Sequence, residues 1–299
     1  MTFPPFLKKG DAIGMVAPAR KITRNEIDFA VRWWEEKGFR VVLGMNLFAE
    51  NGQLAGTDEQ RTEDLQKMLD DSNIKAIFCA RGGHGSLRII DKLDFLGFVL
   101  APKWICGFSD ITVLHSHIHT LYQMATIHAA MPFSMNENNP ANYETLYQTL
   151  IGEKILYNCN PHELNRMGKC SGELIGGNLS LLYALSGSVS DIDTANKILF
   201  IEEVDEYLYH IDRMLLQLKR AGKLQHLAGL LVGSFTKIKD NEITFGSTYE
   251  QIIWEHCKEY HFPIAFNFPA GHGEHNVALK FGATCLLTVE TIETTLREK

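Results

Sequence analysis

The stretch Trp104-Ile105-Cys106-Gly107-Phe108-Ser109-Asp110-Ile111 joins a short apolar run to a helical pattern that extends to Tyr122. Its first three residues are typical of a buried strand, and Gly107 marks a turn. A serine in such a turn can expose its hydroxyl at a sheet edge, where the next helix N-terminus offers N–H groups to an oxyanion. An ordinary serine N-cap is a slightly commoner explanation of the same pattern. The segment predicts a strand–turn–helix unit, with Ser109 as a candidate nucleophile.

Working outward, apolar runs and helical patterns alternate through the first half of the chain. Residues 12–17, 40–43 and 76–79 are short and apolar, as buried strands are. Helical patterns begin at the capping residues Thr23 and Thr57. Another helix is expected through 87–93, after a glycine-rich break. This alternation predicts an α/β fold with a mainly parallel sheet covered by helices on both faces. The loops after its strands would share one edge, where such sheets bind ligands.

The second half follows a polar, asparagine-rich stretch from about 135 to 170 that contains one helical pattern near 142–151. Strands are expected at 198–201 and 228–233, helices near 179–182, 208–221 and 247–259, and β-rich sequence at the end. We therefore expect an N-terminal α/β domain over 1–150 and a linker over 151–168. A smaller C-terminal β/α domain would occupy 169–299.

Composition excludes several classes of protein. The chain has 299 residues and a net charge of −7, which argues against nucleic acid as a partner because phosphate binding needs a basic face. No apolar run approaches the roughly 20 residues of a membrane span, and the N-terminus does not resemble a signal peptide. The six cysteines form no CxxC pair, so reduced thiols are expected. These features predict a cytoplasmic protein with no membrane partner.

Three further segments carry candidate chemistry. Residues 80–86 (Ala-Arg-Gly-Gly-His-Gly-Ser) form either a tight turn or a ligand-binding loop, and they match neither the phosphate-loop nor the dinucleotide pattern. Glu202 follows an apolar run and could orient a histidine, although most strand-end glutamates are simply solvated. His272 lies between two glycines, where a surface loop or a metal pair with His275 is the alternative.

Histidines also recur on the helical pattern that follows Ser109. His115 and His119 share a helix face and could bind a metal, but no glutamate separates them as in the zinc peptidases and no third ligand is evident. Polar packing is the preferred interpretation. We therefore expect no metal and no cofactor, and the roles of both histidines stay open.

Six short motifs, taken together, resemble the LD-carboxypeptidases, which include murein tetrapeptide carboxypeptidases and microcin-immunity relatives. Each motif alone is weak, but six in the family's order over nearly the whole chain are specific. They are Leu54-Ala55-Gly56-Thr57-Asp58-Glu59-Gln60-Arg61, Ala80-Arg81-Gly82-Gly83-x-Gly85, Gly107-Phe108-Ser109-Asp110, Gly176-Gly177-Asn178-Leu179, Phe200-Ile201-Glu202-Glu203 and Gly271-His272-Gly273.

The resemblance implies a serine peptidase with its active site in the cleft between two domains. Ser109, His272 and Glu202 would form the catalytic triad. Backbone N–H groups of Gly83 and Asp110 would form the oxyanion hole. The residues expected to contact substrate are Arg81, Gly82, His84, Gly177 and Asn178, with Arg81 a candidate partner for a terminal carboxylate because of its charge. The resemblance also implies a homodimer and a small peptide or muropeptide as substrate.

The implied reaction is hydrolysis of an L,D-peptide bond, releasing the terminal D-alanine of murein tetrapeptide in cell-wall recycling. Some family members instead cleave peptidyl-nucleotide antibiotics, and His84, where the family often has tyrosine, leaves the substrate open. An α/β-hydrolase esterase shares the order Ser, acid, His, but Ile111 replaces its second elbow glycine. A non-catalytic two-domain ligand-binding protein is the alternative from another class.

Overall fold

The computed structural model describes residues 1–299, and its first strand, β1 (Ala12–Val16), is buried along its whole length. Alternate side chains of a strand point to opposite faces. Ile13 and Met15 accordingly join one apolar cluster, and Ala12 and Val16 join another. A strand with two buried faces needs helices on both sides of its sheet, as the alternating pattern predicted.

The first domain is built on a six-stranded sheet in the order β11-β5-β4-β3-β1-β2. Its strands are β1, β2 (Arg40–Leu43), β3 (Ile74–Cys79), β4 (Trp104–Gly107), β5 (Thr126–His128) and β11 (Leu279–Phe281). The first five run parallel, which confirms the mainly parallel sheet. Only β11 is antiparallel, and it comes from the other end of the chain to pair with β5.

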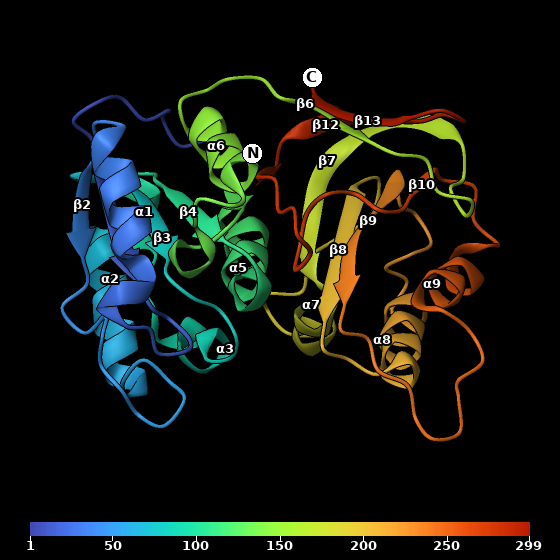
Figure 1. Cartoon of the computed structure of the whole chain (residues 1–299), viewed down its shortest axis with the longest axis horizontal. Coiled ribbons are helices and arrows are strands. Elements are labelled where there is room, and N and C mark those ends of the chain that lie inside the picture. The colour runs from blue at the N-terminus through green and yellow to red at the C-terminus, as the bar shows by residue number, and fades with distance from the viewer.

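Helices cover both faces of this sheet (Figure 1). They are α1 (Arg24–Glu36), α2 (Asp58–Asp70), α3 (Ser86–Ile89), α4 (Leu96–Leu100), α5 (Thr112–Tyr122) and α6 (Pro140–Leu150). The Thr57 hydroxyl oxygen accepts a hydrogen bond from the Gln60 N–H, and the Thr57 N–H donates to Gln60 Oε1, as the capping pattern predicted. The helix expected through 87–93 is interrupted: α3 ends at Ile89, and a 3₁₀ turn covers Ile90–Lys92. None of the helices has the length and apolar character needed to span a bilayer.

The second domain contains a seven-stranded sheet in the order β10-β9-β8-β7-β12-β13-β6. Its strands are β6 (Leu156–Cys159), β7 (Gly168–Asn178), β8 (Ile198–Val204), β9 (Gly229–Thr236), β10 (Ile264–Ala265), β12 (Thr284–Val289) and β13 (Thr294–Glu298). Its helices are α7 (Leu179–Leu185), α8 (Leu208–Arg220) and α9 (Tyr249–Cys257). The neighbours from β10 to β7 pair in parallel, and those from β7 to β6 pair antiparallel.

The segment 151–168, expected to be a linker, is partly structured. Its strand β6 pairs with β13, so it completes the edge of the second sheet instead of leaving the chain free between domains. The alternating exposure of β6 explains why its polar sequence did not suggest a strand.

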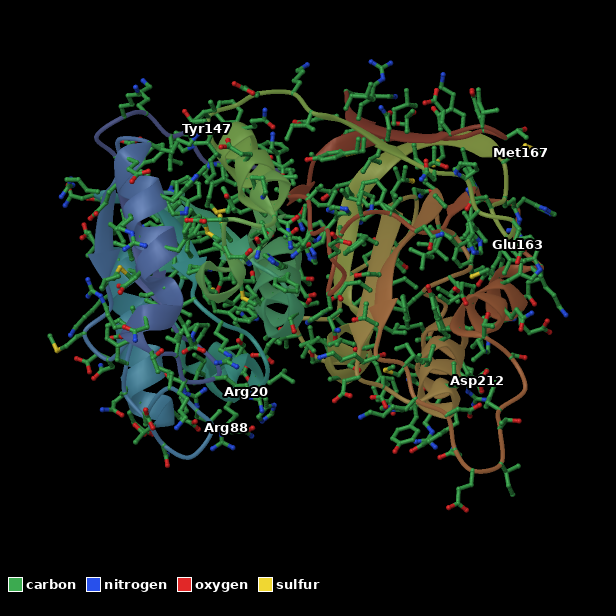
Figure 2. All side chains as sticks on the ribbon, viewed as in Figure 1. Arg20, Arg88, Tyr147, Glu163, Met167 and Asp212 are labelled. Atoms are coloured by element: carbon green, nitrogen blue, oxygen red, sulfur yellow. The ribbon has the colours of Figure 1, made fainter.

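The two domains meet where α5 lies beside β7 and α7, and side chains from both domains occupy the space between α5 and β7 (Figure 2). The Thr112 hydroxyl accepts a hydrogen bond from the Asn178 N–H at 3.0 Å. A Cβ atom on Gly177 would lie 2.3 Å from the same hydroxyl oxygen, so only glycine permits this approach. Together with β11, these contacts hold one domain against the other.

Candidate active site

Ser109 lies on a sharp turn directly after β4, at the carboxyl edge of the first sheet. Its φ angle is +63°, in the left-handed region that non-glycine residues rarely adopt. Such a conformation costs on the order of 1–3 kcal/mol and is concentrated at functional sites. Gly82 supports the turn from the neighbouring loop, because a Cβ atom there would be 3.3 Å from Ser109 Cβ. The strand–turn–helix unit therefore presents the hydroxyl as the sequence suggested.

Ser109, His272 and Glu202 form a continuous hydrogen-bonded chain across the two domains. The Ser109 hydroxyl donates to His272 Nε2 at 3.1 Å, and His272 Nδ1–H donates to Glu202 Oε2 at 2.5 Å. With Nδ1 protonated, Nε2 carries a free lone pair and can accept the proton of the hydroxyl. The structure therefore brings the three expected residues together in the geometry of a nucleophile, a base and a carboxylate that orients it.

Glu202 is fully buried and lies within β8 instead of after its end. The register with β9 shifts between Ile201 and Glu203, and this bulge sets the direction of the carboxylate. Gly271 passes directly over it with φ +109°, and a Cβ atom on Gly271 would be 2.7 Å from Glu202 Cβ. The glycine before His272 is thus required by both its backbone conformation and this close approach.

Burial and the neighbouring carboxylate act in opposite directions on His272. Burial alone would lower its pKa, because the charged imidazolium is poorly solvated there. The charge of Glu202 and its hydrogen bond outweigh that effect, so the pKa of His272 is raised above its ordinary value. A base of this kind favours taking up a proton during a reaction.

The loop that carries His272 is fastened by residues that the sequence interpretation missed. Ser234 Oγ accepts from the Gly273 N–H at 2.7 Å, and the Thr236 hydroxyl donates to the His272 carbonyl at 3.2 Å. Asn276 Oδ1 accepts from the Gly271 N–H at 2.9 Å. Ser234 and Thr236 lie on β9 and carry no motif, so no local signal could have found them.

Helix α6 of the first domain also holds this loop. Asn142 Oδ1 accepts from the Asn276 N–H at 2.8 Å, and Asn142 Nδ2–H donates to the Glu274 carbonyl at 3.3 Å. The position of His272 therefore depends on contacts with both domains.

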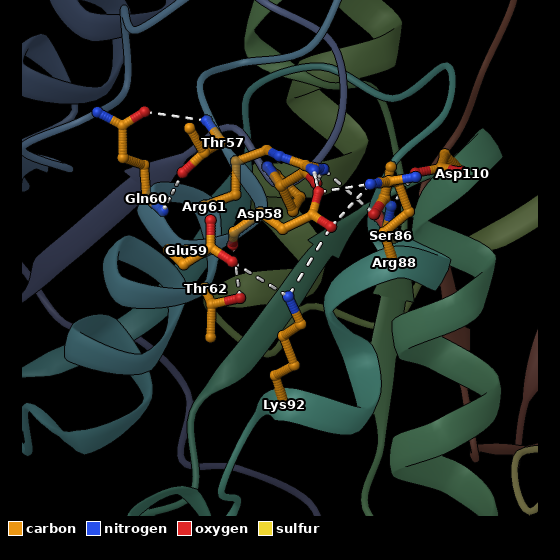
Figure 3. Close-up of polar contacts among 12 residues, drawn as sticks. Thr57, Asp58, Glu59, Gln60, Arg61, Thr62, Ser86, Arg88, Lys92 and Asp110 are labelled. Atoms are coloured by element: carbon orange, nitrogen blue, oxygen red, sulfur yellow. Dashed lines mark hydrogen bonds and ion pairs between the residues drawn. The ribbon is translucent and has the colours of Figure 1, made fainter. Parts of the chain in front are cut away.

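A polar network with the buried residues Arg61, Ser86 and Asp110 at its centre holds the end of the glycine loop (Figure 3). Asp110 Oδ2 accepts from the Ser86 N–H at 2.9 Å, which joins the serine turn to the end of the glycine loop. Arg61 is buried and donates to the carbonyls of Pro18 at 2.9 Å and Gly85 at 3.2 Å.

Asp58 neutralises this buried arginine. It forms ion pairs with Arg61 and with Arg88, the latter at 2.9 Å, and Lys92 lies 3.8 Å away. The part of the first motif from Thr57 to Arg61, called here the threonine-to-arginine motif, therefore has a structural role. Its Arg61 joins the loop after β1 to the loop after β3.

A cleft of about 520 Å³ opens over Ser109 between the domains. The residues that line it are Arg20, Arg81, Gly82, Gly83, Phe108, Ser109, Met131, Phe133, Val204, Asp205, Lys237 and His272. Gly83 has φ +105° and lies in this wall with Ser109 and His272. A cavity of similar volume, about 550 Å³, lies over α2 and Lys92 and lacks this combination of groups, so the cleft over Ser109 is the candidate active site.

Of the residues expected to contact substrate, Arg81 and Gly82 line the cleft. The Arg81 guanidinium donates to Glu26 at 3.2 Å and to the Lys21 carbonyl at 3.3 Å, and it lies over the Phe133 ring. Its charge is therefore already paired.

The other three expected contacts do not fit this geometry. His84 is exposed and is not part of the cleft wall. Gly177 and Asn178 lie at the domain contact, where Asn178 is buried and donates to Glu203 Oε1 at 2.9 Å. The glycine motif of β7 thus serves close packing between the domains, and contact of these three residues with substrate stays a prediction without support from their positions.

The histidines of α5 have other partners. Buried His115 donates from Nε2 to the Gly107 carbonyl at 2.9 Å, which supports the serine turn. His119 Nε2 contacts Glu173 Oε1 at 2.5 Å. No group of three or more histidine, cysteine or acidic side chains is arranged to hold a metal ion.

Comparison with known families matches both domains. The family model of the LD-carboxypeptidase N-terminal domain matches residues 13–129, and that of the C-terminal domain matches residues 171–287. The chain belongs to the LD-carboxypeptidase family. It is therefore an enzyme, a peptidase, and the resemblance seen in its six motifs is confirmed.

Relatives of this LD-carboxypeptidase match over nearly their full length. A "Probable murein peptide carboxypeptidase" of Bacillus subtilis is 38% identical, with 94% of this chain and 89% of the relative covered. The "Murein tetrapeptide carboxypeptidase" of Pseudomonas aeruginosa is 31% identical, with 92% of each chain covered.

Solved structures share the two-domain fold. A muramoyltetrapeptide carboxypeptidase from Oxalobacter formigenes has a TM-score of 0.87 at 23% identity, covering 96% of this chain and 98% of its own. An MccF-like protein from Bacillus anthracis has a TM-score of 0.88 at 24% identity, and the match covers 100% of this chain and 99% of that protein. At these identities the likeness establishes the fold of the LD-carboxypeptidase and nothing finer.

Proposed function

We propose that this LD-carboxypeptidase is a serine enzyme that hydrolyses an L,D-peptide bond and releases the terminal D-alanine of murein tetrapeptide. The observation that carries the proposal is the hydrogen-bonded chain from Ser109 through His272 to Glu202 at the floor of the interdomain cleft. The substrate follows from the names of the two relatives at 38% and 31% identity.

In the first step the Ser109 hydroxyl attacks the scissile carbonyl. Its proton passes to His272 Nε2, and Glu202 stabilises the imidazolium that forms. The negative charge that develops on the carbonyl oxygen is accepted by the backbone N–H groups of Gly83 and Asp110. Losing one such donor typically reduces kcat about 10²- to 10³-fold.

In the second step His272 returns the proton to the leaving amine, and D-alanine departs. The peptide remains as an ester on Ser109. Water then attacks this ester, with His272 again taking the proton, and Ser109 is regenerated. Because His272 must be neutral to begin the cycle, its raised pKa should shift the rise of activity to a higher pH than an unperturbed histidine would give.

The proposal is tested by incubating the purified protein with three compounds. They are a tetrapeptide ending in an L-centre–D-alanine bond, the same peptide ending in L-alanine, and an aminoacyl sulfamoyl adenosine. We expect release of D-alanine from the first compound, with little turnover of the second. Preferred cleavage of the nucleotide conjugate would favour the antibiotic-immunity activity, and cleavage of small esters alone would favour an esterase.

We also propose that the protein acts in the cytoplasm, in peptidoglycan recycling, and as a homodimer. All six cysteines are unpaired, which suits a reducing compartment. Fractionation of cells that express the full chain tests the location, and light scattering of the purified protein tests the dimer. Recovery outside the cytoplasm, or a monomeric mass, would contradict these proposals.

A further inference from the structure

The charged side chains in the cleft are unevenly paired. Arg81 is paired with Glu26 at 3.2 Å, and Asp205 is paired with Lys239 at 2.7 Å. Arg20 and Lys237 line the same cleft and form no ion pair with any carboxylate of the chain. In a protein of net charge −7, two unpaired cations in one cleft mark a place for an anion.

Arg20 is tied to the glycine loop beside the nucleophile. Its backbone N–H donates to the Gly82 carbonyl at 3.2 Å. Its side chain lies across Gly83, where a Cβ atom would be 2.3 Å from Arg20 Cδ and 3.3 Å from Nε. Gly82 in turn approaches Ser109, so consecutive contacts lead from the nucleophile to this guanidinium. Figure 2 shows Arg20 in the lower part of the first domain, in the region where Figure 1 labels α3.

The guanidinium itself remains available. The guanidinium donates one hydrogen bond, from a terminal nitrogen to Gln53 Oε1 at 3.3 Å, which uses one of its five N–H donors. Gln53 is neutral and leaves the charge uncompensated. An arginine with free donors in a fixed fork suits a carboxylate, which it can bind through two parallel hydrogen bonds.

The substrate of a carboxypeptidase carries its terminal carboxylate close to the scissile bond. In a terminal residue, only the amide nitrogen and Cα separate the scissile carbonyl from the terminal carboxylate. The group that recognises this carboxylate must therefore lie within a few bonds' reach of the nucleophile. Arg20 meets this condition through Gly82 and Gly83, whereas Arg81 has its charge paired with Glu26.

We infer that Arg20 binds the terminal carboxylate of the substrate and so determines that the enzyme acts as a carboxypeptidase. This assignment rests on the proposed function and replaces Arg81 as the carboxylate partner. Lys237, on the opposite wall, adds positive potential that attracts the same anion. Substrates with a free terminal carboxylate would be preferred over their amides.

The test compares the tetrapeptide ending in D-alanine with its D-alaninamide, using the full chain. For the wild type we expect a clear preference in kcat/KM for the acid, expressed mainly in KM. Arg20→Met should reduce this acid-to-amide ratio about 10- to 150-fold, the range for loss of a hydrogen bond to a charged group. Arg20→Lys keeps the charge without the fork and should retain part of the preference.

Arg24→Met is the matched control, because Arg24 is an exposed arginine that pairs with Asp28 outside the cleft. It should keep the wild-type ratio. An unchanged ratio in folded Arg20→Met would overturn the assignment. If Lys237→Met lost the preference for the acid and Arg20→Met kept it, the assignment would also be overturned, because Lys237 would then be the residue that binds the carboxylate.

Binding by Ser109→Ala separates this inference from the proposed function. Calorimetry with that variant measures affinity for the acid and the amide without turnover. Acid-selective binding that disappears in Ser109→Ala/Arg20→Met supports the subsite even if the wild type hydrolyses neither compound. Equal affinity of Ser109→Ala for the acid and the amide would refute it.

Discussion

Replacing Glu202 by glutamine tests how the triad works, because it keeps the shape of the side chain and removes its charge. The carboxylate is fully buried and accepts the His272 Nδ1–H at 2.5 Å. Hydrogen bonds to charged groups contribute about 1.5–3 kcal/mol. At 1.4 kcal/mol per factor of ten, that loss alone reduces the rate roughly 10- to 150-fold.

A second effect of Glu202→Gln increases the expected loss. If the amide nitrogen faces Nδ1, the imidazole adopts the wrong tautomer, and the corresponding change in serine proteases reduces kcat about 10⁴-fold. We therefore expect kcat/KM for D-alanine release to decrease by a factor of about 10² to 10⁴, and most of the decrease should be in kcat. Glu203→Gln is the matched control, because Glu203 is a buried neighbour that bonds Asn178 and Ser180 and not His272. It should lose less than tenfold.

The pH profile of the same variant checks the cause. The charge of Glu202 raises the pKa of His272 against the opposing effect of burial. Activity rises with pH as His272 becomes neutral, so removing that charge should move the rise to lower pH. An unchanged acidic limb together with an unchanged kcat would refute the role of Glu202 as the partner of His272.

Three further changes have defined outcomes. Gly271→Ala brings a Cβ atom to 2.7 Å from Glu202 Cβ, so urea unfolding should show that the free energy of unfolding falls by about 1–3 kcal/mol. The decrease should be larger than for Gly222→Ala, whose added Cβ meets open space. Equal decreases in the two variants would contradict the close approach. Arg61→Met removes the donors that hold the Pro18 and Gly85 carbonyls, so kcat should fall at least tenfold with the protein still folded, and an unchanged kcat would show that the glycine loop does not need them. Burial lowers the pKa of His115 to about 4, so between pH 6.5 and 4 only the unfolded chain takes up this proton, and the free energy of unfolding falls by about 3 kcal/mol as the pH falls. His115→Gln should show a smaller decrease over that range, and the same slope as the wild type would refute this origin.

The strand–turn–helix unit around Ser109 could be predicted because each part has a local signal. The apolar run of β4, the turn and the helix of α5 follow one another within the sequence. The same holds for the capped helices α1 and α2. Features that depend on partners far along the chain could not be found in this way. The pairing of β11 with β5 and the place of β6 in the second sheet are of that kind.

The candidate site shows the same division. Ser109, Glu202 and His272 came from motifs, and the structure brings them together. The threonine-to-arginine motif and the glycines of β7 were equally clear in the sequence, but their roles are structural. The first holds two loops of the first domain together, and the second lies at the contact between the domains.

Conversely, Ser234 and Arg20 carry no motif, because their roles arise only when loops from different strands meet. A motif thus shows that a position tolerates few residue types. Only the contacts in the structure show whether the residue takes part in the reaction or holds the fold together.

The most direct test of the account is D-alanine release by Ser109→Ala beside the wild type. The substrate is the tetrapeptide ending in an L-centre–D-alanine bond, and folding of both proteins is checked by thermal unfolding. We predict release by the wild type and a loss of at least about 10³-fold in the folded variant, because no other group replaces the nucleophile. Release of D-alanine by Ser109→Ala at a rate close to that of the wild type would contradict the central claim.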